Sequence, residues 1–272
     1  MPSFSLAALT ALDLPPPQLV EVAHACGFEH VGLRLLAATP GGTAYPLMED
    51  RQQLKETKAR LAATGISVVD LEVVAFRPDT IVPSFEPFLE AGRELGARNT
   101  LVAVYDPDLE RFADRFAEYC TRAERYGLTA DLEFMPWTFV PDLPTASHIV
   151  AKAQSPAAGV LIDALHFDRS RSRLEDLRGI PKGRLHYWQI CDAPAELPAT
   201  MEEMIHAARE ERMFPGEGGI DLVGLAKAMP ADITISIEVP TATLSKTVDA
   251  ETRARRALRG AKAVIAAARA AG

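Results

Sequence analysis

The sequence predicts a (β/α)8 barrel, an α/β fold in which a closed parallel sheet is surrounded by helices, as one domain over residues 1–272. Apolar strand-like runs alternate with amphipathic stretches from end to end, in eight strand-then-helix units. Several of the expected helices are followed directly by glycine, which is typical of a helix end that turns into a strand. The competing fold, a doubly wound open sheet, would usually carry a glycine-rich phosphate-binding pattern after an early strand, and the chain has none.

The apolar runs place the expected strands, in chain order, at residues 4–9, 30–35, 67–74, 100–105, 129–135, 159–165, 185–191 and 233–239. The expected helices occupy residues 16–26, 49–63, 85–95, 109–126, 143–153, 171–177, 222–228 and 250–270. The last of these is rich in Ala and Arg, which are good helix formers, and is expected to close the barrel. Two connections are unusually long, 37–50 and 192–219, and both are expected to cover the face that holds the active site.

Composition excludes several classes of function. The chain has 48% hydrophobic and 24% charged residues and a net charge of -8, with no stripe of basic residues, so a nucleic-acid partner is not expected. No apolar run is long enough to span a bilayer, and the first residues lack the basic start of a signal peptide. The cysteines lie in separate apolar segments without a CxxC spacing, which favours reduced thiols in a cytoplasmic protein. The sequence leaves a homo-oligomer open.

Polar side chains stand near the ends of the last four expected strands. They are Glu133, Asp163, Gln189 and Glu238. Because every second residue of a barrel strand points inward, these groups are expected to converge on the carboxyl-terminal mouth of the barrel. A single strand-end carboxylate is as often a structural hydrogen-bonding group, but carboxylates that share a small space repel one another unless a cation compensates them. An oxygen-rich ligand set favours Mg²⁺ or Mn²⁺, so we expect one such ion.

Other residues are candidates for proton transfer and substrate binding. His166 is expected to be a proton-transfer group beside the metal or a group that orients a ligand. Arg34 and Glu72 are expected either to contact substrate or to form a buried ion pair. The further candidates for substrate contacts are Trp137 after the fifth strand and Arg209, Arg212 and Glu217 in the long connection before the eighth.

The segments LEFMPW, GVLIDALHF, QICDAP, PGEGGIDL and SIEVP resemble the xylose isomerase-like TIM-barrel superfamily, the sugar phosphate isomerase/epimerase group, and the resemblance covers essentially the whole chain. In that family the last four strands supply Glu, Asp, His and Glu to one divalent metal. The resemblance implies that Glu133, Asp163, Gln189 and Glu238 are the ligands here. Gln189 departs from the usual histidine and is similar to the 3-dehydroshikimate dehydratase branch, as is the DxxH pattern of residues 163–166.

These features favour a divalent-metal-dependent isomerase or epimerase that removes a proton beside a metal-bound carbonyl or hydroxyl of a keto-sugar or polyol. In that reading Glu133 and Glu238 are the acid/base pair. The close alternative is a lyase, similar to 3-dehydroshikimate dehydratase or inosose dehydratase, that acts on a cyclic hydroxy-keto acid. There, His166 would transfer the proton and Arg209 or Arg212 would hold a substrate carboxylate. A third reading is a non-catalytic barrel that binds a sugar.

Overall fold

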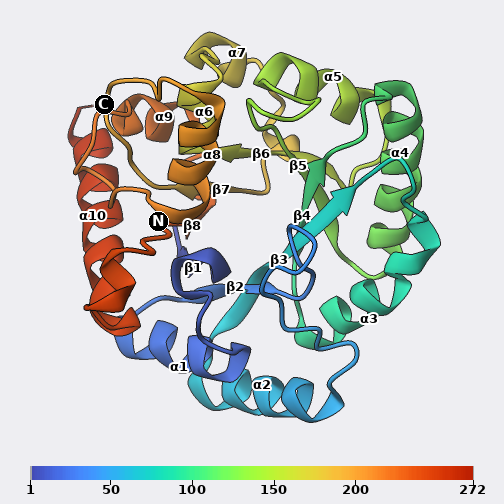
Figure 1. The fold of residues 1–272 in the computed structure, drawn as a ribbon, viewed down its shortest axis with the longest axis horizontal. Helices are drawn as coiled ribbons and strands as arrows, with labels where there is room; N and C mark the ends of the chain where they lie inside the picture. Colours follow the sequence, from blue (N-terminus) through green and yellow to red (C-terminus); the bar gives the residue numbers. More distant parts are fainter. Residues whose placement is uncertain (1, 272) are drawn as a thin grey trace.

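Eight parallel strands close into a barrel in the order in which they occur in the chain, as expected. The computed structural model describes residues 2–271, and Figure 1 shows the outer helices arranged in a ring around the strands. The strands are β1 Phe4–Leu6, β2 His30–Arg34, β3 Ser67–Phe76, β4 Asn99–Val104, β5 Thr129–Glu133, β6 Ala158–Asp163, β7 Tyr187–Ile190 and β8 Thr234–Ile237. The long strand β3 gives the barrel one extended wall.

The helices are α1 Pro16–Cys26, α2 Arg51–Thr64, α3 Glu86–Leu95, α4 Leu109–Arg125, α5 Leu143–Lys152, α6 Ala164–Arg169, α7 Leu174–Arg178, α8 Met201–Glu210, α9 Leu222–Ala228 and α10 Ala250–Ala270. Short 3-10 helices lie at η1 Ala8–Ala11, η2 Val82–Phe85, η3 Lys182–Arg184 and η4 Leu244–Lys246. Helix α10 packs against both α1 and α9, so the last helix closes the ring as expected. Within residues 2–271 no helix combines the length and apolar character needed to span a membrane.

Most strands begin or end a few residues from the expected positions, and the first and sixth show why. The first strand ends at Leu6 instead of residue 9, because the chain turns into η1. In η1 the Thr10 hydroxyl donates to the carbonyl of Ile237 at 2.8 Å and accepts from the amide of Val239 at 2.8 Å, which fastens η1 to the end of β8. The sixth strand ends at Asp163, whose carboxylate accepts the amide of His166 at 3.0 Å and thereby begins α6.

The connection 192–219, for which the sequence predicts a long loop, contains helix α8. Thr200 and Glu203 form a reciprocal capping box at its start, with the amide of Glu203 donating to the Thr200 hydroxyl at 3.1 Å. This helix ends at Glu210, just before Arg212, so it brings the end of the connection back to the barrel mouth.

The inside of the barrel is apolar in the middle and polar at both ends. Its apolar layer consists of Val69, Val73, Leu101, Ala103, Met135, Leu161 and Tyr187. At the amino-terminal end His186 pairs with Asp131 through Nδ1 and Oδ1 at 2.6 Å. The adjacent position must be glycine, because a Cβ at Gly159 would lie 2.2 Å from that aspartate oxygen. Glu133, Asp163, Gln189 and Glu238 lie at the carboxyl-terminal end.

Candidate active site

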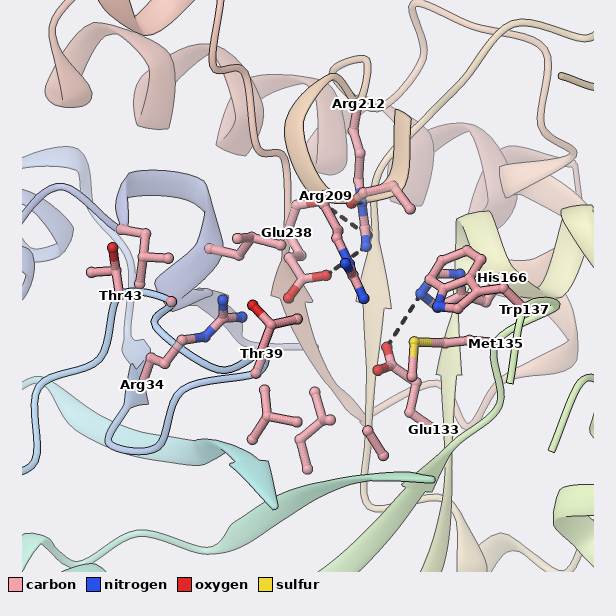
Figure 2. A pocket seen from close by; sticks show the side chains of 18 of the residues that line it. Arg34, Thr39, Thr43, Glu133, Met135, Trp137, His166, Arg209, Arg212 and Glu238 are labelled. Atoms are coloured by element: carbon pink, nitrogen blue, oxygen red, sulfur yellow. Dashed lines mark hydrogen bonds and ion pairs between the residues drawn. The ribbon is translucent and has the colours of Figure 1, made fainter. Parts of the chain in front are cut away.

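A pocket opens at the carboxyl-terminal mouth of the barrel, with about 190 Å³ of free space. Its charged lining residues are Arg34, Glu133, His166, Arg209, Arg212 and Glu238. Apolar side chains complete the wall, notably Val73, Leu101, Ala103, Met135 and Trp137. In Figure 2, Glu133, His166 and Trp137 lie on one side of the pocket and Arg34 lies on the other, with Glu238, Arg209 and Arg212 between them. The site therefore has charged groups around an apolar wall.

Glu133, Asp163 and His166 form a compact group at the ends of β5 and β6 and in α6. One ligand atom from each lies within 4.8 Å of the others, and all three residues are buried. The imidazole Nε2 of His166 is 3.7 Å from Oε1 of Glu133. Trp137 packs edge-on against the His166 ring, with centroids 5.0 Å apart. His166, for which the sequence predicts either proton transfer or the orientation of a ligand, thus also lies in a group of side chains that could hold a metal ion.

Glu238 and Gln189 lie beside a buried arginine. The amide of Gln189 donates to Oε1 of Glu238 at 3.0 Å. Arg212 bridges two of the predicted ligands, with Nη1 2.6 Å from Oδ2 of Asp163 and Nη2 2.9 Å from Oε2 of Glu238. Its Nε donates to the carbonyl of Ala208 at 2.7 Å. Arg212, a predicted substrate contact, lines the pocket and is at the same time the buried counter-charge of Asp163 and Glu238.

Burial sets the protonation of this cluster. It raises the pKa of Glu133 well above its usual range, and the charges of Glu238 and Asp163 raise it further. Burial also raises the pKa of Glu238 to about 7, although Arg212 opposes the shift. It would raise the pKa of Asp163 too, but Arg212 and His166 hold that pKa below its ordinary value. For His166, burial lowers the pKa to about 4, so the ring is neutral at pH 7.

The donor set fits a divalent cation. Glu133, Asp163 and Glu238 provide carboxylate oxygens, and Oε1 of Gln189 is a buried acceptor with no hydrogen-bond partner among residues 2–271. If Glu133, Asp163 and Glu238 were all ionised, the single guanidinium of Arg212 would leave two negative charges unbalanced. A dication would balance that charge and give the amide oxygen a partner. The compact group of possible ligand atoms holds His166 together with Glu133 and Asp163, whereas Glu238 is turned toward Arg212.

The other predicted residues occupy different positions. Arg34 lines the pocket and is held by Glu72, whose Oε2 accepts from Nε at 2.9 Å and from Nη2 at 2.5 Å. Glu72 is fully buried behind it. The two residues therefore form a buried ion pair, and Arg34 also faces the pocket. Arg209 is exposed at the mouth and forms no ion pair within the described residues 2–271. Glu217 does not reach the pocket, because it forms an ion pair with Arg256 of α10 at 2.7 Å.

Several pocket residues were not singled out from the sequence. They are Leu9, Leu12, Ala38, Thr39, Gly42, Thr43, Val73, Leu101, Ala103, Tyr105, Met135 and Ala208. Inward alternation along β4 could have indicated Leu101 and Ala103, since the same rule located the strand-end carboxylates. It could not have indicated Val73, because the register of β3 shifts between Leu71 and Val74. No periodic signal exists for Thr39, Gly42 and Thr43, which lie in the irregular connection after β2.

Comparison with known proteins agrees with this architecture. Residues 20–264 match the family described as xylose isomerase-like TIM barrel. A curated 3-dehydroshikimate dehydratase of Pseudomonas putida is 28% identical over 103 residues, which is 38% of this chain and 16% of that protein. A curated inosose isomerase of Bacillus subtilis is 25% identical over 152 residues, 52% of each chain. The matched stretches thus span about half or less of these relatives.

Solved structures share the fold. The IolI protein with a bound zinc atom superposes with a TM-score of 0.83 at 20% identity, covering 97% of this chain and 98% of that one. A D-psicose 3-epimerase from Clostridium cellulolyticum H10, solved with D-tagatose, gives a TM-score of 0.74 at 14% identity over 97% and 99% of the two chains. A fusion of a xylose isomerase-like TIM barrel with a 4-hydroxyphenylpyruvate dioxygenase gives 0.79 at 20% identity, covering 95% of this chain and 42% of that one. With its barrel, its strand-end carboxylates and a family match over most of its length, this chain belongs to the xylose isomerase-like TIM barrel family.

Proposed function

We propose that this chain is a divalent-metal-dependent dehydratase acting on a cyclic hydroxy-ketone that carries a carboxylate, of the 3-dehydroshikimate type. The proposal rests on one observation: the two groups available for proton transfer, His166 and Glu133, lie on the same side of the pocket. Glu238 is engaged by both Gln189 and Arg212, whereas His166 and Glu133 stand together on the other side of the pocket. Removal of a proton and loss of a β-hydroxyl as water need groups on one face only, which this arrangement supplies.

Glu133, Asp163, Gln189 and Glu238 would hold the metal, with His166 beside it. Mn²⁺ or Mg²⁺ suits this oxygen-rich set. When bound, such an ion polarises the substrate carbonyl and stabilises the negative charge that develops on its oxygen.

His166 is the proposed base. Its ring is buried and neutral, and its Nδ1 has no hydrogen-bond partner among residues 2–271. The ring takes the proton from the carbon next to the carbonyl and then returns it to the departing hydroxyl, so that one C–H and one C–O bond break, a C=C bond forms and water leaves. Trp137 fixes the ring orientation by packing against it.

The remaining lining residues suit the proposed substrate. Trp137, Met135 and Leu101 form an apolar surface against which the face of a carbon ring can lie. The guanidinium of Arg209 at the mouth, which forms no ion pair with the other residues of 2–271, is placed to bind a carboxylate, and Arg34 across the pocket can bind a ring oxygen. A linear polyol would leave more of the apolar surface uncovered.

A keto-sugar isomerase or epimerase, the function favoured by the sequence, is the second candidate. It is supported by the fact that Glu133 and Glu238 both line the pocket, from β5 and from the end of β8. For that reaction Glu238 must be released from Arg212 to act on the second face of the substrate. A barrel that only binds a sugar is the third candidate.

The deciding experiment incubates the purified protein with 3-dehydroshikimate and Mn²⁺ and follows the ultraviolet absorbance of the aromatic product, with keto-sugars and inososes screened in parallel. We expect product formation that chelator abolishes and that His166→Ala reduces by at least about a hundredfold. His206→Ala, which changes an exposed histidine of α8 that does not line the pocket, is the control and should keep full activity. Epimerisation of a keto-sugar without any dehydration would refute the proposal, and metal-free protein that binds sugar without turnover would favour the third candidate.

A further inference from the structure

Asp192, directly after β7, organises the connection that follows it. Its side chain is buried and accepts four backbone amides, from Ala193 at 2.9 Å and Ile220 at 3.1 Å on Oδ1 and from Gly216 and Gly218 at 2.9 Å each on Oδ2. Within residues 2–271 no cationic side chain pairs with it, so these amides are the groups that stabilise its charge. One carboxylate therefore holds the turn 213–220 in place.

The turn is fitted closely around this carboxylate. A Cβ at Gly218 would lie 2.4 Å from Oδ1 of Asp192 and 2.3 Å from the carbonyl oxygen of Ala193. Position 218 must consequently remain glycine for the turn to approach the carboxylate this closely. Neither the turn nor Asp192 contributes a side chain to the pocket lining.

The same turn delivers Arg212 to the active site. Asp192 and Met213 exchange two backbone hydrogen bonds of 2.9 Å, and the amide of Arg212 donates to the carbonyl of Pro240 at 2.9 Å. These contacts fix the backbone of Arg212 between the ends of β7 and β8. From there its guanidinium reaches Asp163 and Glu238 at 2.6 Å and 2.9 Å, with only 3% of its side chain exposed.

We propose that Asp192 is a positioning residue that seats Arg212 among the metal-site carboxylates, and that Arg212 thereby weakens the binding of the divalent ion so that it stays exchangeable. This inference rests on the proposed metal site. Arg212 removes one unit of negative charge from the cluster and occupies one oxygen each of Asp163 and Glu238. A dication entering the site must compete with this guanidinium for the same carboxylates.

The test measures Mn²⁺ affinity in metal-free protein without substrate, by electron paramagnetic resonance titration of free Mn²⁺. The proteins are wild type, Asp192→Asn, Arg212→Gln and the double variant. Arg212→Gln is expected to bind Mn²⁺ at least about tenfold more tightly, because a positive charge near the ion is gone. Asp192→Asn places the side-chain amide donor of Asn against backbone amide donors, which loosens the turn and frees Arg212. It should therefore tighten Mn²⁺ binding in the wild-type background. In the Arg212→Gln background, where the guanidinium is already absent, it should not. Weaker or unchanged Mn²⁺ binding in Arg212→Gln, or an equal effect of Asp192→Asn in both backgrounds, would overturn the inference.

A matched control and a second readout separate this inference from the metal proposal. Asp221→Asn changes an aspartate just after the connection 192–219, whose side chain accepts the amide of Gly224 at 2.8 Å at the start of α9, and it should leave Mn²⁺ affinity unchanged. If wild type binds no Mn²⁺, the metal proposal fails, and melting temperatures in chelator decide the positioning claim. The decrease in melting temperature caused by Asp192→Asn should then be at least halved in the Arg212→Gln background. Equal decreases in the two backgrounds would refute the positioning claim. If Asp192→Asn does not fold, Gly218→Ala disturbs the same turn with the carboxylate retained and is expected to act in the same direction.

Discussion

Replacing Glu72 by alanine should destabilise the protein strongly although Glu72 has no surface in the pocket. Glu72 is completely buried and accepts both the Nε and the Nη2 hydrogen bonds of Arg34, whose side chain is 8% exposed. The substitution leaves the Arg34 guanidinium buried without its counter-charge. Breaking a buried pair in this way costs about 3–5 kcal/mol.

In a protein of this size each kcal/mol lowers the melting temperature by roughly 2–4 °C, so Glu72→Ala should melt about 10 °C below wild type. Differential scanning calorimetry checks this. The double variant Arg34→Met/Glu72→Met removes both charges and keeps the apolar volume, so its melting temperature should return close to that of wild type. Its turnover should stay low, because Arg34 lines the pocket and Glu72 does not.

The comparison distinguishes the two readings that the sequence left open for this pair. If Glu72→Ala melts within about 2 °C of wild type, the pair is not the buried, charge-compensating contact described above. If the double variant regains full turnover together with stability, Arg34 has no role at the substrate and the pair is purely structural. Loss of turnover at restored stability is the result we expect.

Three further predictions follow from the same geometry. Glu133→Gln and Glu238→Gln should each lower turnover at least about a hundredfold with unchanged circular dichroism, and full activity in either variant would contradict its assignment to the metal site. Burial lowers the pKa of His186, but the Asp131 carboxylate outweighs burial and holds the pKa above 6.5; the pair's contribution to stability should therefore be complete below pH 6.5 and be lost as the pH rises through the raised pKa. The melting-temperature gap between wild type and His186→Asn should accordingly be larger at pH 6 than at pH 9, and a gap that widens with pH would refute this. Substrate binding should change the fluorescence of Trp137, and the change should disappear in Trp137→Phe if this side chain is the pocket wall.

The barrel and the strand-end groups were accessible from sequence because both depend on simple periodicities. Alternation along a strand places Glu133 and Glu238 inside the barrel, and the parallel order of the strands brings their carboxyl ends to one face. The same rule holds for Asp163 and Gln189, which are register partners in β6 and β7. Local signals were also sufficient to predict most helices. The Thr200–Glu203 capping box is such a signal for the start of α8, although this helix is not among the predicted ones.

The partners of these groups were not accessible in the same way. Arg212 follows β7 by more than twenty residues, and Glu217 lies five residues further on, with similar polar surroundings in the sequence. Arg212 is buried among carboxylates and Glu217 pairs with Arg256 on the outside, because the turn held by Asp192 directs the two side chains apart. A non-periodic turn built from backbone amides leaves only its glycines and an aspartate as sequence signals.

Charge balance gives a physical reason for the amide at position 189. Gln189 donates to Glu238 through its amide nitrogen, and its buried Oε1 has no hydrogen-bond partner among residues 2–271. A glutamate there would have no hydrogen to donate to Glu238 and would add a further negative charge to a cluster in which burial already raises the pKa of both Glu133 and Glu238. With the neutral amide and the buried Arg212, the cluster would carry two unbalanced negative charges once its three carboxylates are ionised, which equals the charge of one divalent ion. Gln189→Glu should therefore make folding stability depend strongly on added Mn²⁺, and a melting temperature in chelator equal to that of wild type would show that the cluster tolerates the extra charge by another route.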